Sequence, residues 1–259
     1  MISKMSIRVK QNENKPVAVA IIPARLASTR LPRKMLRPVA GRPLLAWTVE
    51  AAQRCPQLDR IVVAVDSEEV ARLCQAEGWE WRMTSTDLPS GTDRMHSISG
   101  EVDAEIYVNI QGDEPLLQPA HIDALLQPFT FGDHVDVTTV KTRCPTHDVA
   151  NPNAVKVVTA ADGRALYFSR ATVPYDRDAA GDVEYWKHIG LYAYRRAALQ
   201  RFPTLPVSKL ERWERLEQLR LLENGLSIYV TEVTAETVGV DTEEDLERVE
   251  QLLRKQRVR

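Results

Sequence analysis

The chain has 259 residues and nearly balanced charge, with 34 Lys and Arg against 36 Asp and Glu and a net charge of −2. This balance gives no overall field that would attract nucleic acid or an anionic membrane, and no apolar stretch approaches the ~18 residues of a membrane span. No two of the 11 glycines stand two or five positions apart, which excludes both the dinucleotide fingerprint and the P-loop.

The cysteines and the N-terminal segment bear on the compartment. The three cysteines show no C-x-x-C spacing, which argues against a disulfide framework or a zinc site and predicts a reducing cytoplasm. Residues 1–16 mix charged and amide side chains without an apolar core. They therefore predict a disordered leader rather than a signal peptide.

From residue 17 to residue 130, short β-branched runs alternate with amphipathic segments of helical length. We expect strands at 17–22, 61–65, 80–84 and 106–110, helices near 43–54 and after residue 66, and a polar loop at 85–94. Asp66, with Glu69, is predicted to cap the second helix, and Gly78 is predicted to end it. This order predicts a parallel or mixed sheet flanked by helices, with ligands beyond the carboxyl ends of the strands.

After residue 130 the pattern becomes richer in strands. We expect strands at 135–142, 154–159, 165–168, 188–194 and 226–233, one long helix at 209–223, and a closing helix that begins near Thr242. Residues 17–259 are therefore predicted to form a single domain with three parts, 17–130, 131–240 and 241–259.

A basic loop follows the first predicted strand. It contains Arg25, Arg30, Arg33 and Lys34, together with the hydroxyl of Ser28. Guanidinium and ammonium groups that converge with hydroxyl donors can bind a triphosphate and neutralise charge that develops during nucleotidyl transfer. The alternative is an ordinary solvated basic loop.

Two acids also occupy positions just after predicted strands. Asp113 follows Gly112 beyond the fourth strand, and Asp241 lies between the last strand and the closing helix. Mg²⁺ prefers one or two carboxylates plus substrate phosphates. The alternatives are a strand-exit turn at Asp113 and a helix cap at Asp241 or Thr242. Because these acids occur together with the basic loop, a site for a metal and a triphosphate is favoured.

Two further segments place polar side chains where a ligand could lie. Residues 90–94 include Ser90 and Arg94, which could contact a base edge or simply begin a helix. On the strand predicted at 188–194, His188 and Tyr192 share one face, and the opposite face is apolar.

One carboxylate is unusual for its position. On the predicted helix 209–223, Glu217 falls between Trp213 and Leu221 within the apolar stripe, and Arg220 lies on the same side. A carboxylate in an apolar stripe is unfavourable unless it is paired. A structural Glu217–Arg220 ion pair is favoured over a contact between Glu217 and a polar ligand.

The motifs at these positions resemble those of the 3-deoxy-manno-octulosonate (Kdo) cytidylyltransferases. The likeness extends over about residues 17–252 and is carried by eight segments in order: 22–34, 90–94, 111–115, 151–158, 166–171, 188–192, 216–220 and 239–242. So many motifs in order and at suitable spacing are highly specific.

The resemblance implies an α/β fold of the nucleotide-diphospho-sugar transferase (Rossmann-like) type. Its sheet is mixed but mainly parallel, residues 17–130 bind the nucleotide, and a smaller β-rich subregion at 131–240 serves sugar binding and dimerisation. The resemblance also implies a cytoplasmic homodimer that uses Mg²⁺ to transfer CMP from CTP to Kdo, releasing pyrophosphate, for lipopolysaccharide synthesis. Neither nucleic acid nor a membrane is an expected partner.

The resemblance also assigns roles to individual residues. Lys34, Arg30, Asp113 and Asp241 would be catalytic, and the two aspartates would bind the metal. The nucleotide would be held by Ala24, Arg25, Ser28, Arg30, Lys34, Ser90, Arg94 and Asp113. The sugar pocket would consist of Gln111, Arg170, His188, Tyr192, Glu217 and Gln218, with the planar fork of Arg170 on the sugar carboxylate.

The sequence departs from the family pattern at two places. Arg33 stands where the family has glycine, which matters if the loop needs a left-handed residue. Residues 209–214 also differ from the usual family segment, so an 8-amino-Kdo substrate stays open. The rival hypotheses are an acylneuraminate cytidylyltransferase and a non-catalytic protein that binds nucleotide sugars.

Overall fold

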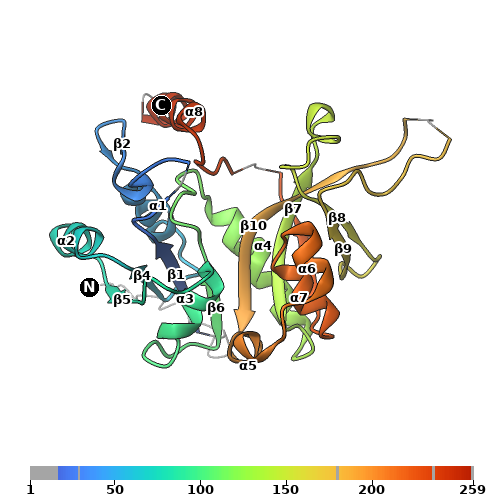
Figure 1. Ribbon diagram of the computed structural model, residues 1–259, viewed down its shortest axis with the longest axis horizontal. Coiled ribbons are helices and arrows are strands. Elements are labelled where there is room, and N and C mark those ends of the chain that lie inside the picture. Colours follow the sequence, from blue (N-terminus) through green and yellow to red (C-terminus); the bar gives the residue numbers. More distant parts are fainter. Residues whose placement is uncertain (1–16, 29, 179–180, 235–236, 258–259) are drawn as a thin grey trace, which may run out of the picture.

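The computed structural model describes residues 17–257 except 29, 179–180 and 235–236 (Figure 1). The leader predicted for residues 1–16 lies outside this part of the chain. Within the described ranges, no helix combines the length and the apolar character needed to cross a membrane.

One mixed sheet runs through the whole described chain. Its strands are β1 (Ala18–Ala24), β4 (Arg60–Val65), β5 (Trp81–Met83), β6 (Ile106–Asn109), β7 (Val137–Arg143), β10 (Trp186–Arg195) and β11 (Ile228–Glu232), in the order β11-β7-β10-β6-β1-β4-β5. Only β10 runs antiparallel to its neighbours on this path. The predicted mixed, mainly parallel sheet is therefore confirmed.

Short strands extend this framework. Strands β8 (Lys156–Thr159) and β9 (Ala165–Ser169) pair with each other, and β8 joins β10 at Lys187. A separate hairpin consists of β2 (Pro38–Val39) and β3 (Arg42–Pro43). Both the 17–130 part and the 131–240 part contribute strands to the main sheet, so a continuous hydrogen-bonded layer joins them.

Helices cover both faces of the sheet. Alternate residues of β1 point to opposite sides, with Ala20 and Ile22 in one apolar cluster and Val19 and Ile21 in the other. Helices α1 (Leu44–Gln53), α2 (Glu68–Glu77) and α4 (Pro119–Leu126) pack on the first side, and α3 (Gly91–Ile98), α5 (Arg196–Arg201), α6 (Lys209–Glu214) and α7 (Gln218–Glu223) pack on the second. Single 3-10 turns occur at η1 (Lys34–Leu36), η2 (Gln127–Phe131), η3 (Thr146–Asp148) and η4 (Phe202–Thr204).

The C-terminal helix returns to the nucleotide half. Helix α8 (Glu243–Arg257) lies near β2 and α1 (Figure 1). Its Leu246 and Val249 are buried in a third apolar cluster with Leu31 and Trp47. Because Leu31 belongs to the basic loop, this cluster brings the start of α8 close to that loop. Asp241 lies just before α8 and is therefore carried to the same place.

The order of the strands creates a crevice at one edge. From β1 the chain continues to β4 and β5 on one side and then crosses to β6 on the other. Loops that leave neighbouring parallel strands in opposite directions open a crevice beyond their carboxyl ends, where ligands bind in α/β proteins. The loops after Ala24 and Asn109 meet at this edge.

The beginning of α2 differs from the prediction. Ser67, rather than Asp66, is the N-cap, because its hydroxyl accepts from the backbone N–H of Val70 at 3.3 Å. The Asp66 carboxylate accepts instead from the N–H of Leu26 at 2.9 Å, since the basic loop supplies a long-range partner. The predicted end is confirmed, with Gly78 in the left-handed region at φ 70°.

The predicted helix at 209–223 is interrupted. Helix α6 ends at Glu214, Arg215 takes a left-handed conformation at φ 56°, and α7 begins at Gln218. The guanidinium of Arg170 donates to the carbonyl oxygen of Glu214 at 2.7 Å. Arg170, directly after β9, thus donates to a carbonyl oxygen that would accept a backbone N–H in a continuous helix. Helical periodicity in the sequence does not reveal such a tertiary contact.

This break also overturns the predicted Glu217–Arg220 ion pair. Arg220 pairs with Glu211 of α6, with Nε 2.8 Å from Oε2. Glu217 instead accepts a hydrogen bond from the hydroxyl of Thr92 in α3. The break changes the relative orientation of α6 and α7. Glu217 and Arg220, which were expected to pair on one helix face, therefore pair with Thr92 and Glu211 instead.

Candidate active site

A lysine lies between the two aspartates predicted from the sequence. The Nζ of Lys34 is 3.0 Å from Oδ1 of Asp241 and in close contact with Oδ2 of Asp113. Arg30 reaches the other oxygen of Asp241 at 2.9 Å. Burial alone would lower the pKa of the Lys34 ammonium, but Asp113 and Asp241 outweigh it and raise that pKa. Three distant segments therefore meet in one compact charge cluster.

Asp241 is available for this cluster because its neighbour caps the helix. The hydroxyl of Thr242 accepts from the N–H of Asp245 at 3.2 Å, and the Asp245 carboxylate accepts from the N–H of Thr242 at 2.9 Å. Of the two caps considered from the sequence, the hydroxyl of Thr242 fills this role. The side chain of Asp241 is thus left to Lys34 and Arg30.

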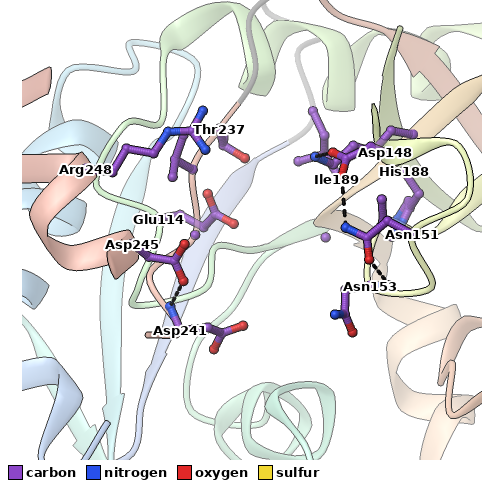
Figure 2. Close-up of a pocket in the computed structure, with 15 residues that line it drawn as sticks. Glu114, Asp148, Asn151, Asn153, His188, Ile189, Thr237, Asp241, Asp245 and Arg248 are labelled. Atoms are coloured by element: carbon purple, nitrogen blue, oxygen red, sulfur yellow. Dashed lines mark hydrogen bonds and ion pairs between the residues drawn. The ribbon is translucent and has the colours of Figure 1, made fainter. Parts of the chain in front are cut away.

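Two cavities open on either side of Asp241. One, of about 470 Å³, is lined by Arg25, Ser28, Arg30, Lys34, Ser90, Gln111, Asp113 and Asp241 among others. The other, of about 340 Å³, lies between Asp241, Asp245 and Glu114 on one wall and Asp148, Asn151 and His188 on the other (Figure 2). The first cavity collects most of the residues predicted to hold a nucleotide, and the second extends toward His188.

The first cavity presents cationic donors. One terminal nitrogen of Arg25 is buried and has no hydrogen-bond partner among the described residues. A buried guanidinium nitrogen without a partner is unfavourable unless a ligand supplies an acceptor. Arg25 thus suits an anion such as a phosphate.

Two predicted nucleotide contacts do not line this cavity. Ala24 is the buried last residue of β1. Arg94 is fully buried in α3, where it bonds to the hydroxyl of Thr84 and reaches Asp66 at 3.3 Å. The Nε of Arg94 has no partner within the described ranges. Arg94 therefore supports the floor of the crevice, with one donor still available.

Gly112 lets the two loops of the crevice approach each other closely. A Cβ at this position would lie 2.9 Å from the backbone oxygen of Pro23 and 2.8 Å from Sδ of Met35. Real Cβ atoms do not come so close to backbone atoms, so any larger residue would push Asp113 away from Lys34. Glycine is required here for packing rather than for an unusual φ.

Arg33 shows that the basic loop does require a left-handed residue. It has φ 57° and ψ 34°, and its guanidinium pairs with Glu69 in the first turn of α2. A non-glycine residue pays roughly 1 kcal/mol for this conformation. Glu69 therefore has a loop-holding role instead of the predicted capping role.

We expect Arg33→Gly to be more stable than Arg33→Ala by about 1 kcal/mol, the reverse of the usual order of these residues. Both variants lose the exposed ion pair with Glu69, so the difference between their free energies of unfolding reflects only the cost of the left-handed backbone conformation. Urea unfolding of the two proteins measures it. Equal stability, or a more stable alanine variant, would show that the left-handed conformation is not costly.

Glu114 is a buried acid that the sequence argument missed. It is 9% exposed, and one carboxylate oxygen has no partner among the described residues. Burial, together with the nearby charge of Asp113, raises the pKa of the Glu114 carboxyl to about 8. Its position next to a strand-end acid was visible in the sequence, but its burial depends on residues 237–239, which pack over it.

This shift predicts a pH dependence of stability. Between about pH 4.5 and pH 8 the unfolded chain releases the Glu114 proton and the folded chain keeps it, so folding stability falls as the pH rises. Glu114→Gln should lack this contribution, and its stability relative to the wild type should increase from pH 5 to pH 8. Urea unfolding of metal-free protein at both pH values checks the result; parallel pH profiles would refute it.

The predicted sugar residues of β10, His188 and Tyr192, are partly buried. The Nε2 of His188 lies 2.9 Å from the hydroxyl of Thr139, which donates its own proton to the carbonyl of Leu191 at 2.7 Å. Nε2 of His188 is therefore the donor. Burial lowers the pKa of His188 to about 3, so the ring is neutral at pH 7. Its ring centroid is 5.4 Å from that of Tyr192, whose pKa burial raises.

The other predicted sugar residues lie in three surroundings. Gln111 lines the first cavity, and its amide donates to Asn109 at 3.3 Å. Gln218 is buried, and its amide nitrogen lacks a partner within the described ranges. Arg170 donates to the carbonyls of Pro152 and Glu214 at 2.9 and 2.7 Å. Arg170 lines neither cavity beside Asp241.

The carboxylates of Asp113 and Asp241 are suited to a divalent cation. In the described part of the chain, no three His, Cys, Asp or Glu side chains form a set that could hold a metal by themselves. Both carboxylates nevertheless contact one ammonium group, so their oxygens converge. This donor set fits Mg²⁺, which takes one or two carboxylates and completes its shell with waters and phosphates.

Comparison with known proteins first defines the class. A family model for cytidylyltransferases matches residues 19–228. Proteins with the same fold but low identity include an inositol-1-phosphate CTP transferase from T. maritima, with a TM-score of 0.66 and 14% identity over 92% of this chain and 96% of that one. The chain is thus a cytidylyltransferase by fold and by sequence.

The more similar relatives narrow the class. The chain is 61% identical to a 3-deoxy-manno-octulosonate cytidylyltransferase of Acidobacterium capsulatum, over 91% of this chain and 96% of the relative. The corresponding protein of Koribacter versatilis is 56% identical over 92% of this chain and 90% of the relative. The solved structure of a CMP:2-keto-3-deoxy-manno-octonic acid synthetase complexed with CTP has a TM-score of 0.89 and 41% identity, and the match covers 93% of this chain and 99% of that one. The chain belongs to the 3-deoxy-manno-octulosonate cytidylyltransferase family.

Proposed function

We propose that this protein transfers CMP from CTP to Kdo and releases pyrophosphate. The observation that carries the proposal is the convergence of Lys34, Asp113 and Asp241 beside a cavity lined by Arg25 and Arg30. This arrangement offers cations for a triphosphate and carboxylates for its metal at the ligand-binding edge of the sheet. The 61% identity to a family member supports the choice of sugar.

The residues of the cavity have distinct tasks in this reaction. Arg25 and Ser28 hold the phosphates, and Lys34 and Arg30 neutralise the charge that develops on the leaving pyrophosphate. When bound at Asp113 and Asp241, Mg²⁺ supplies electrostatic stabilisation of the phosphate oxygens. The anomeric oxygen of the sugar forms the new bond to the α-phosphorus and gives up its proton to water, and the bond from that phosphorus to the pyrophosphate oxygen breaks. Catalysis is then mainly positioning, without a protein nucleophile.

We further propose that the sugar lies toward His188, Tyr192, Glu217 and Gln218. Since Nε2 of the neutral His188 ring donates to Thr139, its Nδ1 offers an acceptor for a sugar hydroxyl, and the unpartnered amide nitrogen of Gln218 offers a donor. Arg170 is kept as a contact for the sugar carboxylate, and it would exchange at least one carbonyl partner to make that contact. Ser90 lines the first cavity and is kept as a contact on the cytidine side, whereas Arg94 is fully buried outside that cavity and would act there by supporting α3.

The assembly and compartment form part of the same proposal. We expect a cytoplasmic, Mg²⁺-dependent homodimer whose subunits meet through the β-rich part at 131–240. Leu166 on β9 is 59% exposed and Trp213 on α6 is 75% exposed, and such large apolar side chains suit an interface. Sedimentation of the purified protein tests the dimer; a monomer at micromolar concentration would contradict it.

A substrate panel tests the activity. Pyrophosphate release is measured with CTP or UTP, each combined with Kdo, 8-amino-Kdo or a sialic acid, with and without Mg²⁺. We expect release with CTP, Kdo and Mg²⁺ together. Release with only the 8-amino sugar or only the sialic acid would assign a related cytidylyltransferase, and no release with any sugar would favour a non-catalytic binding protein.

A further inference from the structure

A side-chain hydrogen bond joins two segments that are 125 positions apart. The hydroxyl of Thr92, in the first turn of α3, donates to the carboxylate of Glu217, directly before α7. Thr92 is only 3% exposed, so water does not compete freely for its hydroxyl. Its neighbour Ser90, whose hydroxyl donates to the carboxylate of Asp93 at 2.7 Å, lines the first cavity beside Asp241. The bond thus connects a nucleotide-side helix with a segment of the second half.

The direction of the proton in this bond is defined. A carboxylate only accepts, so the single proton of the Thr92 hydroxyl goes to Glu217. The phenol oxygen of Tyr194 lies 3.5 Å from the same hydroxyl and is then the donor to it. Tyr194 on β10 therefore helps to hold the Thr92 hydroxyl in the orientation that faces Glu217.

The backbone on both sides of the bond is fixed. The hydroxyl of Ser90 caps α3 by accepting from the N–H of Asp93 at 3.1 Å. Glu217 follows the left-handed Arg215 and is flanked by the buried Leu216 and Gln218. Since neither backbone is free to adjust, the Thr92 hydroxyl determines where the Glu217 carboxylate points.

We propose that Thr92 is a positioning residue that orients Glu217 toward the acceptor sugar. This inference rests on the proposed function, in which Glu217 contacts the sugar. Neither Thr92 nor Glu217 lines the two cavities beside Asp241, and Thr92 is the more deeply buried of the two, with 3% of its surface exposed. The effect of Thr92 on the reaction should therefore pass through Glu217 and appear in the use of the sugar rather than of CTP.

The test compares Thr92→Val, which keeps the shape and removes the hydroxyl, with Thr92→Ser, which keeps the hydroxyl. A hydrogen bond to a charged group predicts that Thr92→Val raises the KM for Kdo about tenfold or more, with the KM for CTP within about twofold. Thr92→Ser should retain wild-type KM values. In a Glu217→Ala background, Thr92→Val should have no further effect on the KM for Kdo.

Several outcomes would overturn the inference. A Thr92→Val effect confined to CTP, equal defects in the valine and serine variants, or additive effects with Glu217→Ala would each assign Thr92 a packing role. Thr92→Ala provides a second hydroxyl deletion if the valine variant does not fold. If the wild type releases pyrophosphate from CTP and Kdo but Thr92→Val behaves like it, only this inference fails; an inactive wild type overturns the proposed function as well.

Discussion

Asp113→Asn and Asp241→Asn should each reduce kcat by roughly a thousandfold, because each removes a charged oxygen ligand from the place where pyrophosphate leaves. Asparagine keeps the shape of the side chain, and both positions are partly exposed, so the fold should persist. Steady-state pyrophosphate release at saturating CTP and Kdo, over a range of Mg²⁺ concentrations, measures the loss. Circular dichroism verifies that the fold is retained.

Asp162→Asn is the matched control for these variants. Asp162 lies in the turn between β8 and β9 and is half exposed, with an ion pair to Arg164. Its removal should leave kcat within about twofold of the wild type. Near-normal activity in either Asp113→Asn or Asp241→Asn would remove that residue from the metal site.

Lys34→Met should lower kcat by about a hundredfold and also weaken the metal-free protein. Lys34 is 8% exposed and is the shared partner of Asp113 and Asp241. Without the ammonium the two carboxylates repel each other, which we expect to reduce the free energy of unfolding by roughly 1–3 kcal/mol. Added Mg²⁺ should then raise the unfolding temperature of the variant more than that of the wild type, because its cation replaces the lost charge.

Arg37→Met provides the comparison for Lys34. Arg37 belongs to the same loop region but forms an exposed pair with Glu243 on α8. Such a pair contributes about 0–1 kcal/mol, so this variant should keep its activity and its ordinary response to Mg²⁺. A Lys34→Met protein with unchanged Mg²⁺ response would contradict the idea that Lys34 and the metal share the same carboxylates.

Sequence patterns predict the sheet well because its strands are buried on both faces. The run at 61–65 is continuously apolar, the run at 106–110 is apolar except for Asn109, and each lies next to β1 in the central part of the sheet. The strand-end acids and the basic loop follow from this order, since parallel strands bring their carboxyl-end loops to one edge. These features need only local composition and the topology of α/β proteins.

The missed features all depend on contacts between distant segments. The predicted helix at 209–223 is interrupted where Arg170 donates to the carbonyl oxygen of Glu214. Asp66 does not cap α2 because its carboxylate accepts from the backbone N–H of Leu26. Helical periodicity contains no information about either partner. The same holds for Glu217, whose partner Thr92 lies 125 positions away. The sequence does show that Glu217 is an acidic side chain within an apolar stripe, which indicates that it has a partner but not which one.

Product analysis is the most direct test of the central claim, that the Lys34 and aspartate cluster catalyses transfer of CMP to Kdo. Phosphorus NMR of the protein with CTP, Kdo and Mg²⁺ should show one new phosphodiester resonance, from CMP-Kdo, growing in equal amount with pyrophosphate. The Asp113→Asn protein should show neither within the same time. Free CMP without the phosphodiester, or unchanged CTP with the wild-type protein, would contradict the account.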